Sequence, residues 1–167
     1  MTNEQPPLVH VDDLSFAEQS HGDSFQARIA SIASLIGGRK LGYRLVEVPP
    51  GKRAWPFHHH YVNEEMFFIL EGEGELRHGQ GRHPIRAGHV IAAPPGDADQ
   101  AHQLINTGSQ TLRYLAVSTM EQPDVFGYPD SDKFGVFVGA APGGPRSSRQ
   151  FEFFGRKSSE LDYWEGE

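Results

Sequence analysis

Three histidines and one glutamate are spaced along this chain so that they could bind a metal ion together. His58 and His60 are two residues apart, and side chains two apart on a strand point to the same face. Glu65 follows a turn-like stretch, at the head of an apolar run typical of the next strand, and His102 comes later. Two imidazoles and a carboxylate on adjacent strands, with a third imidazole, form a usable metal site. The pattern therefore predicts chemistry or binding centred on a metal.

Two features of the same segment allow other interpretations. The run His58-His59-His60 could be a polar surface segment, although its flanks are typical of folded strands. Within a strand, His59 has the opposite parity and is expected to point away from the metal. Glu64 is the alternative to Glu65 as the acidic ligand.

The composition limits the classes of protein that this chain can represent. With 167 residues, it is expected to form one domain, or one domain with extended ends. A net charge of −7 argues against nucleic acid as a partner, and the absence of cysteine excludes disulfides and thiolate ligands. No apolar run approaches the ~20 residues of a membrane span, and the N-terminus lacks the features of a signal peptide. We expect a soluble cytoplasmic protein.

Short apolar runs separated by glycine and proline predict an all-β sandwich or barrel. Most of the links are short, so neighbouring strands are expected to run antiparallel. Residues 25–36 fit a helix and a strand about equally, and periodicity does not decide between them. The predicted strands are Leu41–Val48, Ala54–His60, Glu65–Glu71, Gly74–His78, His89–Ala93, His102–Ile105, Thr111–Ser118 and Phe134–Val138.

Two segments carry more apolar surface than one chain is expected to expose. The run that starts at Glu65 is apolar on both faces, whereas a strand with one solvated face would alternate. A second sheet, the N-terminal segment or another subunit must cover its outer face, and we expect a homodimer. Near the C-terminus, Tyr163 and Trp164 stand among acidic residues. The cost of leaving such rings in water predicts that this tail docks on an apolar surface.

The spacing of these residues resembles the two motifs of the cupin superfamily. In the first motif, His58 and His60 are followed by four residues, Glu65, six residues and Gly72. The second motif matches Gly88, Pro94-x-Gly96 and His102 with Asn106. The chain has one extra residue before His58 and three extra residues after Gly96, both in turn-like sequence where length changes are tolerated. The register to Gly72 favours Glu65 over Glu64.

This resemblance implies a double-stranded β-helix, the jelly-roll barrel of cupins, with N- and C-terminal extensions. Residues 41–140 would form the barrel. Residues 1–40 would be an extension that packs on the barrel or on a partner subunit, and residues 141–167 a C-terminal loop and tail. More narrowly, the chain is similar to small bacterial cupins described as sugar-phosphate isomerases, through features such as Glu47–Arg53 and the closing Asp162–Glu167.

By motif position, the resemblance implies that His58, His60, Glu65 and His102 are the metal ligands. Imidazole and carboxylate suit one divalent transition metal ion, with Zn, Fe, Mn and Ni as candidates, and nothing in the set selects one. Open coordination positions would bind water or a chelating substrate.

A metal-dependent enzyme acting on a small oxygenated metabolite is the leading functional hypothesis, with a sugar-phosphate isomerase as one form. An Fe-dependent dioxygenase and a non-catalytic small-molecule-binding cupin are the alternatives. Isomerisation needs a base near the reacting carbon, and Glu64 and Glu47 are candidates. The candidate substrate-binding residues are Lys52, Arg53 and Tyr43, although no glycine-rich phosphate loop is visible.

Overall fold

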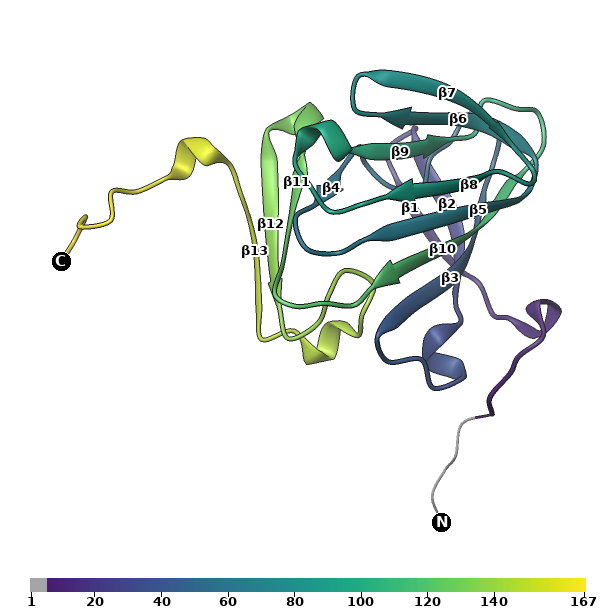
Figure 1. The fold of residues 1–167 in the computed structure, drawn as a ribbon, viewed down its shortest axis with the longest axis horizontal. Coiled ribbons are helices and arrows are strands. Elements are labelled where there is room, and N and C mark those ends of the chain that lie inside the picture. The colour runs from purple at the N-terminus through teal and green to yellow at the C-terminus, as the bar shows by residue number, and fades with distance from the viewer. Residues whose placement is uncertain (1–5) are drawn as a thin grey trace, which may run out of the picture.

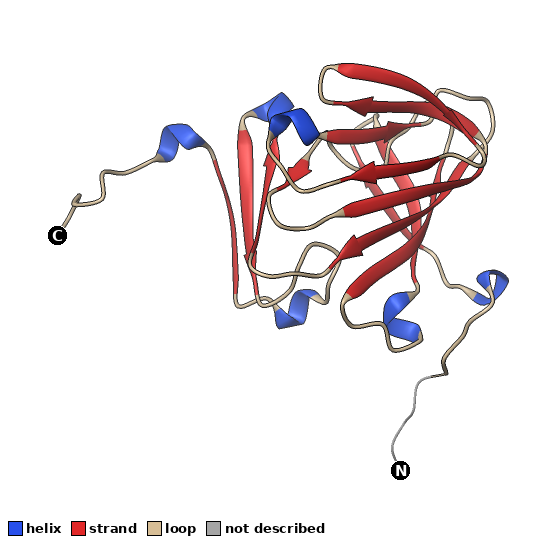
Figure 2. Ribbon diagram, viewed as in Figure 1, coloured by secondary structure: helices blue, strands red, loops and turns tan. Residues whose placement is uncertain are grey.

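The computed structural model describes residues 6–167 as a stack of antiparallel sheets with six short 3-10 helices (Figures 1 and 2). This confirms the all-β prediction. The strands are β1 (Ala17–His21), β2 (Phe25–Ser31), β3 (Leu41–Val48), β4 (His59–His60), β5 (Glu65–Glu71), β6 (Glu73–His78), β7 (Gly81–Arg86), β8 (Val90–Ala93), β9 (His102–Ile105), β10 (Leu112–Thr119), β11 (Asp124–Tyr128), β12 (Lys133–Val138) and β13 (Phe151–Gly155). The 3-10 helices are η1 (Val11–Asp13), η2 (Ala33–Leu35), η3 (Ala98–Gln100), η4 (Pro129–Ser131), η5 (Arg146–Ser148) and η6 (Lys157–Ser159).

Three sheets build the body of the molecule. The largest has the strand order β1-β2-β3-β10-β5-β8, the second β13-β12-β11-β4 and the third β7-β6-β9. All named strand pairs are antiparallel, as the short links require. Strand pairing crosses both of the expected barrel boundaries. Strand β2 pairs with β3 across residue 41, and β12 pairs with β13 across residue 140.

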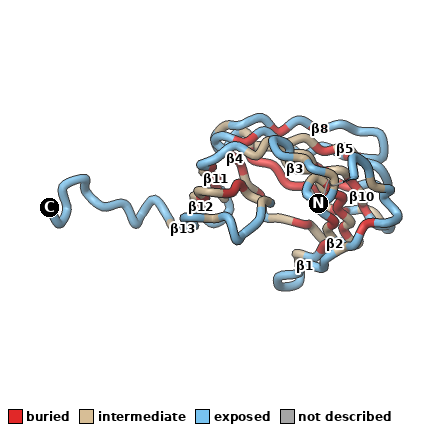
Figure 3. The backbone as a smooth tube through the Cα atoms, turned by 90° about the horizontal axis from the view of Figure 1, so that it is seen from below, coloured by how far each residue is buried: buried red, intermediate tan, exposed pale blue. Residues whose placement is uncertain are grey.

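The main core lies between the largest sheet and the three-stranded sheet. Inward-facing side chains of β3, β5 and β10, such as Val46, Ile69 and Leu112, meet Leu76 and Leu104 from the smaller sheet. Figure 3 shows the buried positions gathered on the inner strands. Burying this much branched and aromatic surface is the main stabilising contribution to such a domain.

A second apolar cluster covers the outer face of β2 and β3. Leu14 from the N-terminal segment packs there with Ala30 and Leu45, and Phe16 and Tyr43 lie against them. The N-terminal segment thus covers part of the outer surface of β2 and β3, and not the outer face of β5 for which a cover was expected. Within β5 and β8 the cover is less complete, because Leu70 and Val90 are exposed.

The structure decides one open assignment and changes one predicted strand. Residues 25–36 divide into strand β2 and the short helix η2, because β2 pairs along β3 and this pairing outweighs the weak helical periodicity. The predicted strand Ala54–His60 shortens to His59–His60, because Pro56 has no backbone N–H for a sheet ladder. The predicted strands do not include β1, β7, β11 and β13.

Within a single chain, the expected docking of the C-terminal tail is not observed. Leu161, Tyr163 and Trp164 are exposed, and the segment after β13 extends away from the sheets instead of docking on them (Figures 1 and 3). Tyr163 and Trp164 contact each other edge to face, with ring centroids 4.8 Å apart. Within residues 6–167, no helix is long and apolar enough to cross a membrane.

Candidate metal centre and cavity

Three imidazoles converge on one oxygen of Glu65. His60 lies on β4, His58 just before it, His102 at the start of β9 and Glu65 at the start of β5. The Glu65 Oε2 atom lies 2.9 Å from His102 Nε2 and 3.6 Å from the Nε2 atoms of both His58 and His60. Backbone hydrogen bonds between His58 and His102 hold β9 against the segment that carries the His pair. The structure therefore brings all four predicted ligands together.

The opposite ring nitrogen of each histidine contacts an oxygen of the protein, which fixes the orientation of the ring. The contacts are His58 Nδ1 with the Pro56 carbonyl at 2.8 Å, His60 Nδ1 with Asp124 Oδ2 at 2.7 Å and His102 Nδ1 with the Gln100 carbonyl at 3.3 Å. Such partners favour a proton on Nδ1 and leave the Nε2 lone pair for a cation. The site is thus arranged as metal-binding imidazoles are in proteins.

Asp124 is a site residue that the sequence did not reveal. It starts β11, and its side chain is fully buried with Oδ1 unpartnered among the described residues. It reaches His60 because β11 pairs with β4, far away in the chain. A buried carboxylate behind a histidine increases the basicity of that ring toward a metal.

Burial and pairing shift the pKa values of the cluster in different directions. Burial lowers the pKa of His58, which keeps this imidazole neutral. Burial acts on the pKa of His60 in the same sense, but the hydrogen bond to Asp124 and the charge of Glu65 outweigh it and raise that pKa. Burial would raise the pKa of Glu65, whereas the hydrogen bond with His102 and the nearby imidazoles of His58 and His60 hold it well below its usual value. The cluster therefore contains an ionised carboxylate.

The donor set fits a divalent ion. The ligand atoms of His58, His60 and Glu65 all lie within 4.8 Å of one another. Neutral imidazole nitrogen and carboxylate oxygen are ligands that Zn, Fe, Mn and Ni share, so the chemistry of the set supports a first-row metal without choosing one.

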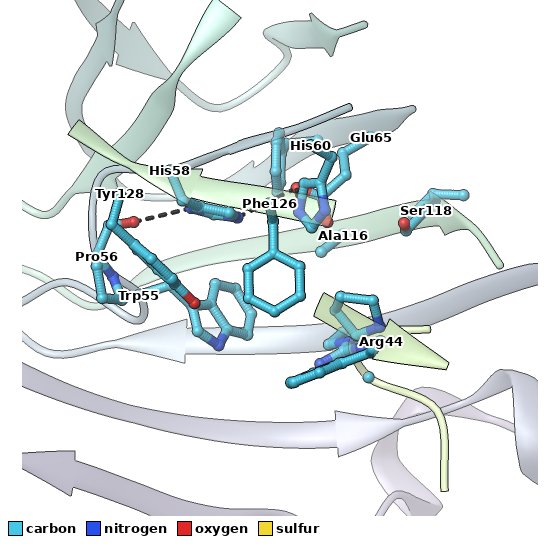
Figure 4. Close-up of a pocket in the computed structure, with 15 residues that line it drawn as sticks. Arg44, Trp55, Pro56, His58, His60, Glu65, Ala116, Ser118, Phe126 and Tyr128 are labelled. Carbon is cyan, nitrogen blue, oxygen red and sulfur yellow. Dashed lines mark hydrogen bonds and ion pairs between the residues drawn. The ribbon is translucent and has the colours of Figure 1, made fainter. Parts of the chain in front are cut away.

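The cluster forms part of the wall of a cavity of about 130 Å³. Figure 4 shows His58, His60 and Glu65 on one side of the Phe126 ring, and Arg44 across the cavity from His60 and Glu65. Burial raises the pKa of Tyr128, on the same wall, to about 12, so this phenol keeps its proton at neutral pH. The other walls are mainly apolar and include Trp55, Phe67, Ala116 and Phe137. Such a cavity favours binding of a small molecule next to the cluster.

The other candidates from the sequence lie elsewhere. Glu64 is exposed, and Glu47 forms ion pairs with Arg28 and Arg113 on the sheet surface. Neither carboxylate lines the cavity.

The three candidate substrate-binding residues are also outside the cavity. Lys52 donates a hydrogen bond to the Asp23 carbonyl, Arg53 lies over the Phe25 ring, and Tyr43 packs in the outer apolar cluster. His59 contacts the Gly96 carbonyl at 2.8 Å and lines a different hollow, as its parity predicts.

Arg44 and Tyr128 line the cavity but were missed from the sequence. For Arg44 a signal was present, because it has the same strand parity as Val46 and Val48, which are fully buried. A cation at an inward-facing position is a reason to expect a functional role.

Comparisons with known proteins give the family. Residues 44–118 match the model of the cupin domain. The oxalate-binding protein of Thermotoga maritima is 33% identical over 97 residues, which cover 58% of this chain and 75% of that protein. Its name describes that protein's ligand.

Solved structures share the fold. A structure described as a cupin-superfamily sugar phosphate isomerase from Silicibacter pomeroyi has a TM-score of 0.75 and 23% identity, covering 92% of this chain and 95% of that one. A predicted oxalate decarboxylase from Thermotoga maritima has a TM-score of 0.58 and 25% identity, covering 67% of this chain and 97% of that one. The double-stranded β-helix implied by the motifs is thereby confirmed, and the chain belongs to the cupin family.

Proposed function

We propose that this protein is a metal-dependent cupin that acts on a small oxygenated metabolite, with His58, His60, Glu65 and His102 binding one divalent transition metal ion. The convergence of three Nε2 atoms on Glu65 Oε2, at the wall of a mainly apolar cavity, is the observation that carries the proposal. A bound ion would act as a Lewis acid on a carbonyl or hydroxyl oxygen of the substrate. The identity of the metal is left open by the donor set.

Residues around the cluster would support catalysis with any of the candidate metals. Trp55, Phe67 and Phe126 exclude water from the cavity and so strengthen the electrostatic interactions inside it. Because its pKa is raised to about 12, Tyr128 keeps its proton at neutral pH and can donate a hydrogen bond to a substrate oxygen.

The size and charge of the cavity favour a small acid or carbonyl compound over a sugar phosphate. Its volume of about 130 Å³ is well below the ~300–1,000 Å³ of pockets for drug-sized ligands. Lys52 and Arg53, the cations considered for a phosphate, lie outside it. The isomerase hypothesis is supported by a similar solved structure that is described as a sugar phosphate isomerase. A dioxygenase would require Fe(II) in the same ligand set.

A comparison of metal-loaded and chelator-treated protein tests the proposed function. Both samples would be incubated with small hydroxy acids, keto acids and sugar phosphates in deuterated water, while NMR follows solvent exchange and an electrode follows oxygen. We expect turnover or proton exchange of a small metabolite only in the loaded sample, because the metal polarises the reacting oxygen. Ligand-induced thermal stabilisation without any reaction would identify a binding module instead.

We also propose that the protein is a homodimer formed through β13 and the C-terminal tail. Strand β13 lies at the edge of its sheet, and an open edge is a template for pairing with another chain. Phe151 and Phe153 stack on one another at 6.4 Å and are about half exposed, and Trp164 is exposed beyond them. A second copy would remove these rings from water.

If the tail forms the dimer interface, the mass of the protein in solution should fall when the tail is deleted. Sedimentation equilibrium of the full chain should give twice the mass of one chain, and deletion of residues 156–167 should shift the protein toward the monomer. An unchanged metal content would show that the shortened protein is folded. A full-length protein that sediments with the mass of one chain would contradict the proposal.

A further inference from the structure

Arg44 places a positive charge inside the barrel. On β3 its parity is that of Val46 and Val48, which are both fully buried in the main core. Arg44 itself is partly buried and lines the cavity that also exposes Glu65 and His60. An arginine in such a position costs free energy unless an anion accompanies it.

The guanidinium of Arg44 has no carboxylate partner of its own in the described chain. Arg44 makes no side-chain hydrogen bond or ion pair within residues 6–167, and its guanidinium carbon lies over the Trp55 ring, 5.7 Å from the ring centroid. Six other arginines do pair with carboxylates, namely Arg28, Arg77, Arg82, Arg113, Arg146 and Arg149. Arg44 is therefore a cation on the cavity wall that has no carboxylate within ion-pair distance among the described residues.

Glu65 does not fill this role. Burial lowers the pKa of Arg44, and the negative charge of Glu65 offsets this effect only in part. The same carboxylate is held by His102 at 2.9 Å and belongs to the proposed metal centre. A divalent ion there would take up the charge of Glu65 and leave Arg44 without any compensating anion.

A glycine of the 139–150 loop lies next to the guanidinium of Arg44. Gly143 has a φ of +84°, and a Cβ atom at this position would lie 1.5 Å from Arg44 Nη2. The backbone thus passes directly over the guanidinium, and only a residue without a side chain leaves that space free. Gly143 and Arg44 thus line the same part of the cavity wall.

We propose that Arg44 binds the carboxylate of a small organic acid whose neighbouring oxygen reaches the metal centre across the cavity. The inference rests on the proposed function and names its substrate class. The planar guanidinium matches a carboxylate with two parallel hydrogen bonds. A phosphate would bring about −1.5 to −2 charges, and Arg44 is the one Arg or Lys among the described residues that line the cavity.

Calorimetric titration of the zinc-loaded protein tests this assignment. The probes are glycolate, its neutral analogue glycolamide, and inorganic phosphate. We expect glycolate to bind at least ~10-fold more tightly than glycolamide or phosphate, because only glycolate offers a carboxylate together with a neighbouring oxygen. Arg44→Gln should remove this preference by weakening glycolate alone, and Arg44→Lys should restore part of it.

Two further readouts separate a binding role from a structural one. The zinc content of Arg44→Gln should equal that of the unaltered protein, and its ligand-free Tm should not fall, because the substitution removes an unpaired partly buried charge. Equal affinities of glycolate for the unaltered protein and Arg44→Gln, or tighter binding of phosphate, would overturn the inference. If the unaltered protein binds no zinc, the proposed metal centre itself fails.

Discussion

Replacing His58 with alanine is expected to abolish stoichiometric metal binding. The variant loses one Nε2 donor, whereas loss of a residue that only supports a ligand typically costs ~10–100-fold in affinity, so we expect a larger loss. His58 is the suitable target because its Nδ1 contacts a backbone carbonyl, that of Pro56, and no buried charge is left behind. Metal content by mass spectrometry and competition with a chromophoric chelator measure the effect.

Matched variants make this result specific. His83→Ala removes an exposed histidine of β7 and should leave the metal content unchanged. Asp124→Asn keeps all four ligands but weakens the support of His60, so its affinity should fall by the smaller ~10–100-fold. A metal content in His58→Ala equal to that of His83→Ala would refute the ligand assignment.

Site residues could be predicted from the sequence where a short motif or strand parity identifies them. His58, His60 and Glu65 lie close together in the sequence. Strand parity places the two histidines on one face, and the spacing of the cupin motif adds Glu65. The strands β3, β5 and β9 likewise have the predicted bounds, because their apolar runs are uninterrupted.

Asp124 and Tyr128 could not be placed in this way. Their positions relative to the cluster depend on the pairing of β11 with β4, which joins segments remote in the chain, and neither residue carries a local motif. The weak candidates Glu47 and Tyr43 illustrate the opposite error. They have suitable side chains on β3, but their parity turns them to the outer face, where ion pairs and the second apolar cluster hold them. Parity along β3 was the better guide, since it singles out Arg44.

Replacing Asn106 with alanine is expected to cause a large loss of stability without loss of the metal. Asn106 is fully buried after β9 and satisfies three backbone groups. Its Nδ2 donates to the carbonyls of Val48 at 2.7 Å and Gln110 at 2.8 Å, and its Oδ1 accepts from the Gly108 N–H at 3.0 Å. These bonds tie the β9–β10 turn to the end of β3.

An alanine would leave those three groups without partners. At ~1–3 kcal/mol for a buried unsatisfied group, partly relieved by water at the turn, we expect a destabilisation of about 3 kcal/mol. For a domain of this size, that corresponds to a fall in Tm of roughly 6–12 °C, measurable by thermal unfolding of metal-free protein. Gln110→Ala is the matched control, because only the backbone carbonyl of that exposed residue takes part, and its effect should stay within ~0.5 kcal/mol. If Asn106→Ala unfolds at the temperature of Gln110→Ala, the turn does not depend on these bonds; if it loses the metal while remaining folded, Asn106 acts on the metal centre as well as on the turn.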